Sequence, residues 1–567
     1  KGTFSFDRYS SGTVSRGMNP DYYNPATGRD DEGNLIISKK TNGDNFLGYS
    51  KSGDYGNKSI YMELSLNYDH TFAEKHAVSA MLMFNRRNYD DGSKLPYRNQ
   101  GFAGRTSYTY SGKYVAEFNF GYNGSENFAP GKRYGFFPSG AIGWIISEED
   151  FMQPARKVIS KLKLRASYGQ VGNANLSGRR FAYLSTIADS YGDMGMYKWG
   201  EDGSFDRVGM AEGEFAVPDL TWEVVNKANL GLELGLFNGM LDLSLDYFDE
   251  RRNGIFMQRE SIPLTAGFIK QPWSNFGKVT NRGAEAALNF NKRIGKDLFL
   301  SVMGTFTYAH NEITEQDEAD AVVGTNRART GHPINQLFGY VADRLFTEDD
   351  FVDVENGILK EEIPAQNFSS KLRPGDIKYV DVNKDGKVDV FDKTAIGGTV
   401  DPEIVYGFGA NLQYKGFDFS VTTYGAFGAQ VARSWRKFSD GQYENYTTEV
   451  YDYWHGEGTS NRYPLLAPGN SGQNFQAISD IYIDDADYVR IQNLTIGYDF
   501  KRIWKNCPFQ QLRVYAAAQN LFTFTGYKGM DPENGRALND KEPWVTGVDV
   551  GNYPQPRTYM VGVNVKF

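Results

Sequence analysis

The chain has 567 residues, a formal net charge of −9, one cysteine and 15% aromatic residues. The acidic balance excludes a typical nucleic-acid-binding protein, because such proteins present basic grooves to phosphates. The single Cys507 excludes an intrachain disulfide, and no run of about 18 apolar residues predicts a membrane-spanning helix. The 62 glycines and the many aromatic residues suit closed antiparallel sheets with aromatic girdles and tight turns.

Segments in which apolar and polar residues alternate recur along the chain and predict antiparallel strands. The hairpin at 230–247 is the clearest, because leucines alternate with Gly, Glu, Ser and Asp on both sides of Asn238-Gly239, which predicts a two-residue turn. Lys415-Gly416 predicts a second tight turn. We count roughly sixteen such segments. Alternation is clear at residues 62–68, 114–122, 230–247, 298–308, 404–421, 488–500 and 512–518.

The connections between these segments are of two kinds. Some are tight turns, and others are long, at about residues 173–220, 311–402, 432–483 and 525–554. Short turns at one end and long loops at the other are typical of bacterial outer-membrane barrels, whereas several loops of that length are unusual in a compact soluble domain. The sequence therefore predicts an all-β, transmembrane antiparallel β-barrel with short periplasmic turns and long extracellular loops.

The last eleven residues, 557–567, predict a membrane-crossing strand. A tilted strand of about ten residues can cross a bilayer. Period-two alternation places one set of side chains against lipid, namely Tyr559, Val561, Val563, Val565 and Phe567. We expect the terminal aromatic residue to serve as the signal that the barrel-insertion machinery reads.

One polar motif has the spacing of a calcium-binding loop. Its residues place oxygen side chains at positions one, three, five, nine and twelve of the loop, with Gly386 at position six for the sharp turn. The candidate calcium ligands are Asp381, Asn383, Asp385, Lys387 through its backbone carbonyl, Asp389 and Asp392. We expect the ion to staple the long 311–402 loop, and the alternative is an Asp/Gly turn satisfied by water.

Aromatic residues in the long loops are candidates for ligand binding, because aromatic rings stack on sugar faces. The tryptophans are Trp199, Trp273, Trp435, Trp454 and Trp544, and Tyr443 and Tyr446 lie among them. The alternative for each is an interfacial girdle or packing within a loop. The acidic runs at 348–350 and 484–487 predict solvated charges in loops and at strand ends, and the alternative for the second run is that it faces the lumen.

Nothing in the sequence favours catalysis. The five histidines form no His-Glu-x-x-His motif, and no Gly-x-Ser-x-Gly elbow is present. We predict that the chain is not an enzyme.

An ordered set of motifs between about residue 134 and the end of the chain resembles the barrel of SusC/RagA-type TonB-dependent outer-membrane transporters of Bacteroidota. The motifs are YGFFPSGAIGW at 134–144, SEEDF at 147–151, LKLRASYGQVGN at 162–173, LTWE at 220–223, NFGKVTNRG at 275–283, DYVRIQNL at 487–494 and AQNLF at 518–522. The resemblance implies a barrel of about 22 strands that is plugged by an amino-terminal domain. It also implies a TonB box, TonB itself and a SusD-like surface lipoprotein as partners, and import of oligosaccharides or oligopeptides across the outer membrane.

The chain departs from this pattern because neither a plug domain nor a TonB box is found in it. We therefore expect residues 1–567 to be the carboxyl-terminal barrel portion, and the strand that closes against residues 561–567 to lie outside this sequence. Two alternatives stay open. One is a passive porin of roughly sixteen strands formed by this chain alone. The other is a surface adhesion or scaffold barrel whose loops bind a protein.

Overall fold

The computed structural model describes residues 1–567 except 93–94, 189–195, 203, 209, 367, 369–370, 434–438, 441–447, 461, 466, 469–477, 535–546, 550 and 552. Its main element is one sheet of sixteen strands, the number that the alternating segments predict. The sixteen strands are β1 (Gly2–Gly17), β4 (Gly48–Phe72), β5 (His76–Asp90), β6 (Tyr97–Tyr110), β7 (Tyr114–Ser125), β8 (Tyr134–Ile145), β9 (Ile159–Asn173), β14 (Glu223–Leu236), β15 (Leu241–Gln258), β16 (Trp273–Ile294), β17 (Leu298–Glu315), β26 (Ile404–Tyr414), β27 (Phe417–Phe427), β32 (Tyr488–Asp499), β33 (Gln511–Thr525) and β35 (Thr558–Lys566).

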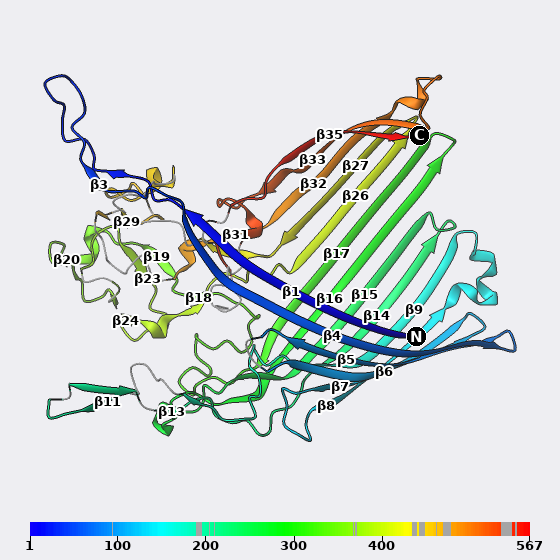
Figure 1. The fold of residues 1–567 in the computed structure, drawn as a ribbon, viewed down its shortest axis with the longest axis horizontal. Helices are drawn as coiled ribbons and strands as arrows, with labels where there is room; N and C mark the ends of the chain where they lie inside the picture. Colours follow the sequence, from blue (N-terminus) through cyan, green and yellow to red (C-terminus); the bar gives the residue numbers. More distant parts are fainter. Residues whose placement is uncertain are drawn as a thin grey trace.

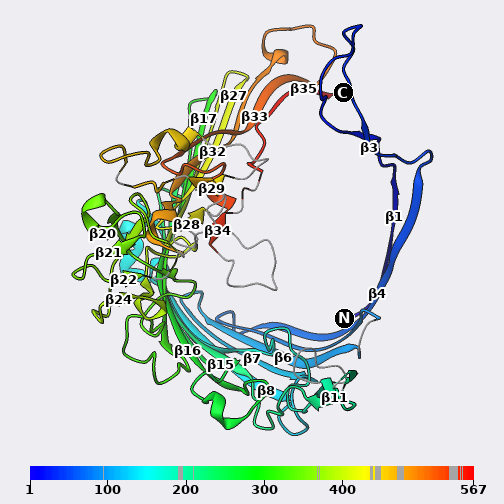
Figure 2. The ribbon, with the colours of Figure 1, turned by 90° about the vertical axis from the view of Figure 1, so that its left-hand side faces the viewer.

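Each strand of the sheet pairs antiparallel with the next one along the chain, so the sheet is an up-and-down meander (Figure 1). Seen from the end, the sheet curls around an open centre (Figure 2). β1 pairs with β4 and β35 pairs with β33, and these two strands are the edges of the sheet. The ring is therefore not closed by pairing between its first and last strands.

The turns agree with the predictions except at one hairpin. Lys415 and Gly416 form the two-residue turn between Tyr414 and Phe417, and both have positive φ, 48° and 91°. The predicted two-residue turn at Asn238-Gly239 is wrong. Leu236 pairs with Leu241, and Phe237 and Asn238 both adopt positive φ, so the connection has four residues.

The long connections carry small elements of their own, gathered at one end of the strands (Figure 1). The short strands are β2 (Tyr22–Tyr23), β3 (Lys39–Thr41), β10 (Ile187–Ala188), β11 (Met196–Trp199), β12 (Phe205–Val208), β13 (Ala211–Glu212), β18 (Phe338–Gly339), β19 (Ala342–Leu345), β20 (Phe351–Asp353), β21 (Ile358–Leu359), β22 (Ala365–Gln366), β23 (Ile377–Tyr379), β24 (Lys387–Val388), β25 (Thr394–Ala395), β28 (Gln430–Arg433), β29 (Ser439–Asp440), β30 (Ala467–Pro468), β31 (Ile483–Asp485) and β34 (Val548–Asp549). The helices of the long connections are short 3-10 turns: η3 (Leu264–Ala266), η4 (Glu348–Asp350), η5 (Val390–Asp392), η6 (Thr448–Asp452), η8 (Asp480–Tyr482) and η10 (Pro532–Asn534). Three further 3-10 turns lie at the opposite end of the strands: η1 (Ile146–Glu148), η2 (Asp150–Ala155) and η9 (Phe500–Arg502). Within the described ranges, no helix is long and apolar enough to cross a membrane.

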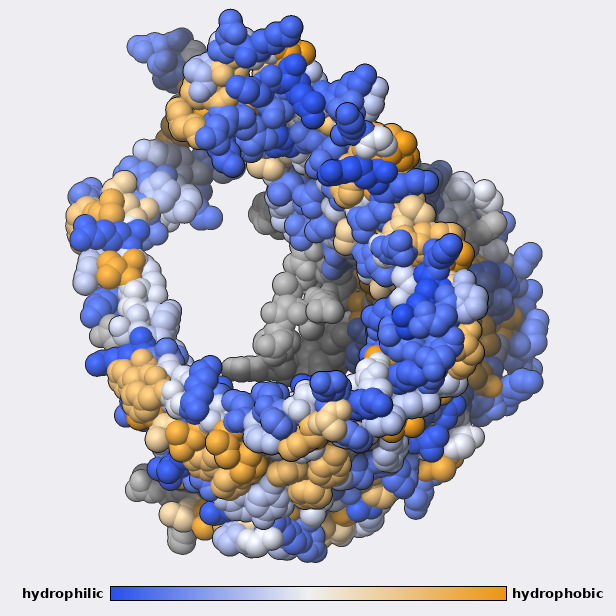
Figure 3. Space-filling model, turned by 90° about the vertical axis from the view of Figure 1, so that its right-hand side faces the viewer, coloured by the Kyte–Doolittle hydropathy of each residue, from blue (hydrophilic) through white to orange (hydrophobic). Residues whose placement is uncertain are grey.

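The register gives the sheet one apolar and one polar face. In a single row across the sheet, Leu245 pairs with Leu232 on one side and with Ala286 on the other, and Ala286 pairs with Phe306. The adjacent row holds Asp246, Glu285 and Thr307. Figure 3 shows hydrophobic side chains over the outside of the wall and hydrophilic ones around the opening. We call the polar side the lumen face and the apolar side the outer face.

Among the residues that the structure describes, most fully buried side chains lie in the long loops rather than in the sheet. Residues 316–403 and 428–487, which we call the loop lobe, share one core. It is formed by Tyr340, Leu345, Ile377, Tyr379, Val388, Tyr453, Tyr463 and Ile481. The long loops therefore fold against each other, which the sequence alone did not predict.

Candidate functional site: the lumen face and the loop lobe

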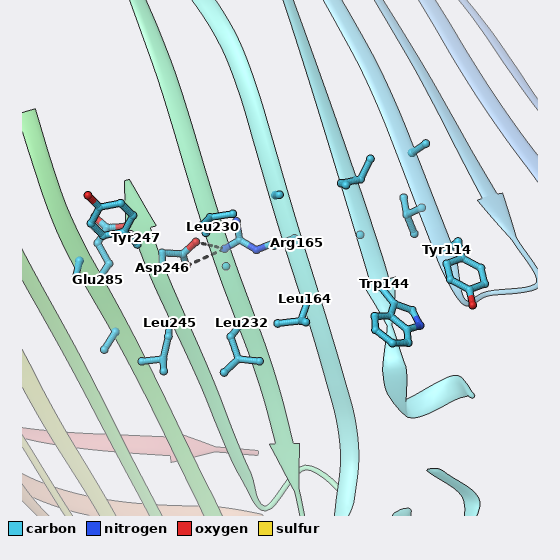
Figure 4. A pocket seen from close by; sticks show the side chains of 18 of the residues that line it. Tyr114, Trp144, Leu164, Arg165, Leu230, Leu232, Leu245, Asp246, Tyr247 and Glu285 are labelled. Atoms are coloured by element: carbon cyan, nitrogen blue, oxygen red, sulfur yellow. Dashed lines mark hydrogen bonds and ion pairs between the residues drawn. The ribbon is translucent and has the colours of Figure 1, made fainter. Parts of the chain in front are cut away.

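Ion pairs that cross neighbouring strands line the lumen face. Glu233 of β14 accepts from Lys161 at 2.7 Å and from Lys163 at 3.2 Å, both on β9. Arg165 of β9 reaches across β14 to Asp246 of β15, with an N–O distance of 2.6 Å (Figure 4). These charges are partly exposed, so they lie on a wall that meets water and do not form a dry core.

A more buried ionic network lies farther along the same face. The Arg490 side chain on β32 is 2% exposed, and its guanidinium is 2.6 Å from the Asp531 carboxylate. It also pairs with Glu533, which accepts hydrogen bonds from the Tyr424 hydroxyl at 2.8 and 2.9 Å. The carboxylate of Asp531 in turn accepts from the backbone N–H of Gln555 at 3.1 Å.

This network fixes part of the connection between β33 and β35 to the inside of the wall. The described residues of 526–557, namely 526–534, 547–549, 551 and 553–557, are called the luminal segment. They also contribute β34, whose Val548 pairs in parallel with Ala432 of β28. The Tyr527 hydroxyl donates to Asp549 at 2.6 Å. Figure 2 shows β34 on the inner side of the wall. Sequence reasoning missed Arg490 because its partners lie about 40 residues away in a loop with no periodic pattern.

A second buried arginine holds the loop lobe. Arg433 of β28 is 1% exposed and pairs with Asp484 at 2.7 Å and with Glu449 at 2.9 Å. The prediction that the 484–487 run is solvated is therefore wrong for Asp484. It is also wrong for Asp350 in the 348–350 run, because Asp350 is 3% exposed and both its oxygens accept from Arg344 at 2.6 Å. Asp484 and Asp350 therefore belong to buried ion pairs with arginines and are not solvated charges.

Two carboxyl groups of the loop lobe have pKa values shifted in opposite directions. Burial raises the pKa of Asp376 to about 6, since a backbone hydrogen bond from Arg373 and the Arg373 charge offset only part of the desolvation. For Asp350, burial would raise the pKa, but the Arg344 hydrogen bonds and charge hold it well below its ordinary range.

The candidate calcium loop turns sharply at Gly386. Gly386 has a φ of 89°, and the Asp381 carboxylate accepts backbone N–H groups of Lys384, Asp385 and Gly386 at 2.6 to 3.3 Å. Asp392 is fully buried and accepts the N–H groups of residues 382, 383 and 389. The loop joins the lobe core through Val388, which lies between these residues.

The side-chain oxygens of this loop do not converge on one point. The Lys387 ammonium lies 3.0 Å from Asp389 and 3.9 Å from Asp385. Across the part of the chain that the structure describes, no three His, Cys, Asp or Glu side chains form a group that could hold a metal ion. The calcium site therefore stays a prediction, and the Lys387 ammonium lies beside two of its candidate ligands, Asp385 and Asp389.

The candidate aromatic residues whose side chains the structure describes, Trp273 and Trp454, pack against neighbouring residues. Arg179 lies 4.2 Å above the Trp273 ring, and Phe256 stacks on the ring with centroids 5.2 Å apart. Trp454 packs against the lobe core and covers Gly375. Both contacts favour the packing alternative. The backbone of Trp199 lies in β11, and Trp435, Trp544, Tyr443 and Tyr446 lie outside the described residues.

The comparison with protein families identifies the sheet. Residues 2–521 match the family model described as TonB dependent receptor-like, beta-barrel. The chain belongs to the TonB-dependent receptor family. It is an outer-membrane β-barrel protein, as its alternating strands and its resemblance to SusC/RagA-type transporters predict. The family is one of receptors and transporters, and the absence of enzyme activity in this chain stays a prediction.

Several members of the family are similar over most of this chain. TonB-dependent receptor P3 of Formosa agariphila is 28% identical over 479 residues, which are 82% of this chain and 45% of that protein. TonB-dependent receptor SusC of Bacteroides thetaiotaomicron is 29% identical over 490 residues, 82% of this chain and 43% of SusC. This TonB-dependent receptor chain thus spans about half the length of the curated relatives it matches.

Solved structures show the same fold. The RagAB peptide importer in its open-open state aligns with 100% of this chain and 59% of its own, with a TM-score of 0.71 and 20% identity. The closed-closed state aligns with 90% of this chain and 56% of its own, with a TM-score of 0.68 and 21% identity. At this identity the likeness establishes the barrel architecture of the receptor and nothing about its ligand.

Proposed function

We propose that this chain is the barrel wall of an importer that takes up oligosaccharides or oligopeptides across the outer membrane with energy from TonB. The observation that carries the proposal is the family match over residues 2–521. The hydrated, charge-paired lumen face supports it, since a polar solute needs a polar wall. The two candidate substrate classes, glycans and peptides, are those that the sequence resemblance to SusC/RagA-type transporters implies.

We also propose that a SusD-like surface lipoprotein works with this chain, and that further strands and a plug domain complete the pore. The uncovered edges of β1 and β35 support additional strands, because a bilayer does not tolerate unpaired backbone groups. The loop lobe supports a lipoprotein partner, because it offers a folded surface at the end opposite the short turns.

The proposal is tested by uptake in a strain that lacks the gene. We expect the strain to lose growth on one glycan or peptide as sole nutrient, and a plasmid copy to restore it. Import should stop when a protonophore removes the energy that TonB transmits. Import that survives the protonophore would indicate a passive porin, and unchanged growth on every glycan and peptide would indicate an adhesion or scaffold barrel.

We further propose that the loop at 381–392 binds calcium as a structural ion. Its spacing and the φ of Gly386 support this. Binding requires the carboxylates of Asp385 and Asp389 to turn away from Lys387.

A further inference from the structure

A shallow apolar groove of about 980 Å³ crosses the outer face of the wall. Its lining extends over β6–β9 and β14–β17, and Figure 4 shows its side chains from close by. The outer-face residues that line it are Tyr108, Tyr114, Ala116, Ile142, Trp144, Leu164, Ala166, Leu230, Leu232, Leu245, Tyr247, Ala284, Ala286 and Phe306. These residues belong to the rows that face lipid. The lining is completed by residues that alternate with them along the strands: Val115, Gly143, Arg165, Gly231, Asp246 and Glu285.

Small residues at matching register positions create the depression. Ala116 and Ala166 flank Ile142 in one row, and Ala284 follows Tyr247 in the same row. Ala286 lies two residues farther along β16, in the next row of the outer face. Ile142, Leu230 and Tyr247 stand between the alanines in this row, so the wall is lowest at the alanines and the larger side chains separate these low points.

The groove rises from the short-turn end toward the middle of the membrane. Ala116 is four residues beyond Gly112 of its turn, whereas Ala286 is nine residues before Gly295 of its turn. From β7 to β16 the line crosses five strand spacings, which is about 24 Å at 4.8 Å each. Because barrel strands are tilted by about 40°, this line climbs about 15 Å, the thickness of one hydrocarbon leaflet.

The lower end of the groove lies at the depth of lipid headgroups. Glu149 accepts hydrogen bonds from the Tyr114 hydroxyl at 2.6 Å, from the Trp144 indole N–H at 3.0 Å and from the Lys113 ammonium at 3.0 Å. Tyr and Trp with apolar bodies and polar tips mark membrane interfaces. The groove therefore begins at the polar boundary of the short-turn side, which is the periplasmic side in outer-membrane barrels.

We propose that this groove is a binding site for one acyl chain of a phospholipid in the periplasmic leaflet. Its apolar lining, its start at the interfacial girdle and its rise through one leaflet match a lipid tail, and it is continuous with the lipid-facing surface of the barrel. The bound lipid fills the space between the large side chains, so it exchanges more slowly than the lipids around the rest of the wall. The inference does not depend on which solute is imported.

The test fills the groove in the full-length protein. The double variant Ala116→Phe, Ala284→Phe places two rings in it, and Ala410→Phe is the control, because Ala410 faces outward on β26 away from the groove. Apolar substitutions on the lipid face leave barrel folding intact, and heat-modifiable migration on gels verifies this. Each protein is purified from membranes in detergent, and its retained phospholipid is measured by native mass spectrometry.

We expect the wild-type protein and Ala410→Phe to retain one phospholipid, and the double variant to retain at least about tenfold less. Equal retention by all three proteins would overturn the proposal, since it would indicate ordinary surrounding lipid. Two other results would also overturn the proposal, because the groove would then have another occupant. The wild-type protein would retain either a lipopolysaccharide or a second copy of itself, and the double variant would not.

Discussion

Arg490 carries its charge in a place with almost no access to water. Taking a guanidinium and a carboxylate out of water is expensive, and pairing with Asp531 and Glu533 offsets the cost. If Arg490 is removed, Asp531, which is 4% exposed, is left as a buried unpaired charge. The luminal segment then loses its main attachment to β32.

We expect Arg490→Met to lower the free energy of unfolding by about 3–5 kcal/mol. The control is Arg251→Met, since the Arg251 side chain is 61% exposed and its pair with Asp249 contributes about 1 kcal/mol or less. Urea unfolding of the full-length protein in lipid vesicles measures both. Adding Asp531→Leu to Arg490→Met should recover much of the loss. Equal losses of unfolding free energy in Arg490→Met and Arg251→Met would show that the buried network does not stabilise the barrel.

The calcium loop predicts a difference between two aspartates of the same loop lobe. We expect heat of calcium binding in calorimetry of the wild-type protein and its loss in Asp385→Ala, which removes a candidate ligand. Asp349→Ala is the matched control, because Asp349 is an exposed carboxylate outside the motif. Equal heats for the wild-type protein and Asp385→Ala would show that the loop is a polar turn without an ion.

Asp376 makes the stability of the loop lobe depend on pH. Its pKa of about 6 in the folded lobe lies above the ordinary 3.8, so the folded state binds the proton more tightly. The stabilisation is complete below about pH 4 and is lost as the pH rises to about 6. A shift of this size corresponds to roughly 2–3 kcal/mol.

We expect Asp376→Asn to remove the loss of loop-lobe stability that occurs as the pH rises, and so to stabilise the lobe at neutral pH. Asp350→Asn should do the opposite, because the low pKa of Asp350 stabilises the fold only while its carboxylate is charged. Hydrogen exchange of loop-lobe amides, corrected for the intrinsic effect of pH, measures both variants. A wild-type lobe that is equally protected at pH 4 and pH 7 would contradict the prediction for Asp376.

At the scale of the strand, the alternation of apolar and polar residues places one residue against lipid and the next one against water in the lumen. Leu288 of β16 lies on the outer face between Leu243 and Gly304, and Ala287 lies on the lumen face between Ser244 and Thr305. We expect Leu288→Arg to cost about 2–4 kcal/mol, the cost of a cation near the middle of the bilayer. Ala287→Arg should cost far less. Unfolding in vesicles measures both, and equal costs would mean that the faces are assigned wrongly.

The strands were predictable because their signal is local. Period two in a hairpin such as 230–247 fixes both the strand and its lipid face, whatever the rest of the chain does. The four-residue turn at 237–240 was not predictable from the sequence. Asn238-Gly239 favours a shorter turn, whereas the pairing of Leu236 with Leu241 sets the register of the hairpin. Arg490 on β32 pairs with Asp531 in the following connection, and Arg433 pairs with Asp484 at the other end of its own connection. No periodicity records such pairs.

At the scale of the whole molecule, the two sheet edges decide what the chain can do alone. β1 has 16 residues and β35 has nine, and neither pairs with the other. In hydrocarbon each unpaired backbone group costs several kcal/mol, so a stable membrane barrel needs both edges paired. A porin formed by this chain alone would need β1 and β35 to meet, which the observed curvature does not achieve (Figure 2).

We therefore expect residues 1–567, refolded into phosphatidylcholine vesicles without other segments, to form no stable conducting channel. The full-length protein should insert and show heat-modifiable migration. Single-channel recordings in planar bilayers compare the two under the same conditions. The contrary result is stable, uniform conductance from residues 1–567, which would mean that β1 and β35 pair in lipid. That outcome would favour the passive porin and remove the structural reason for further strands in the wall.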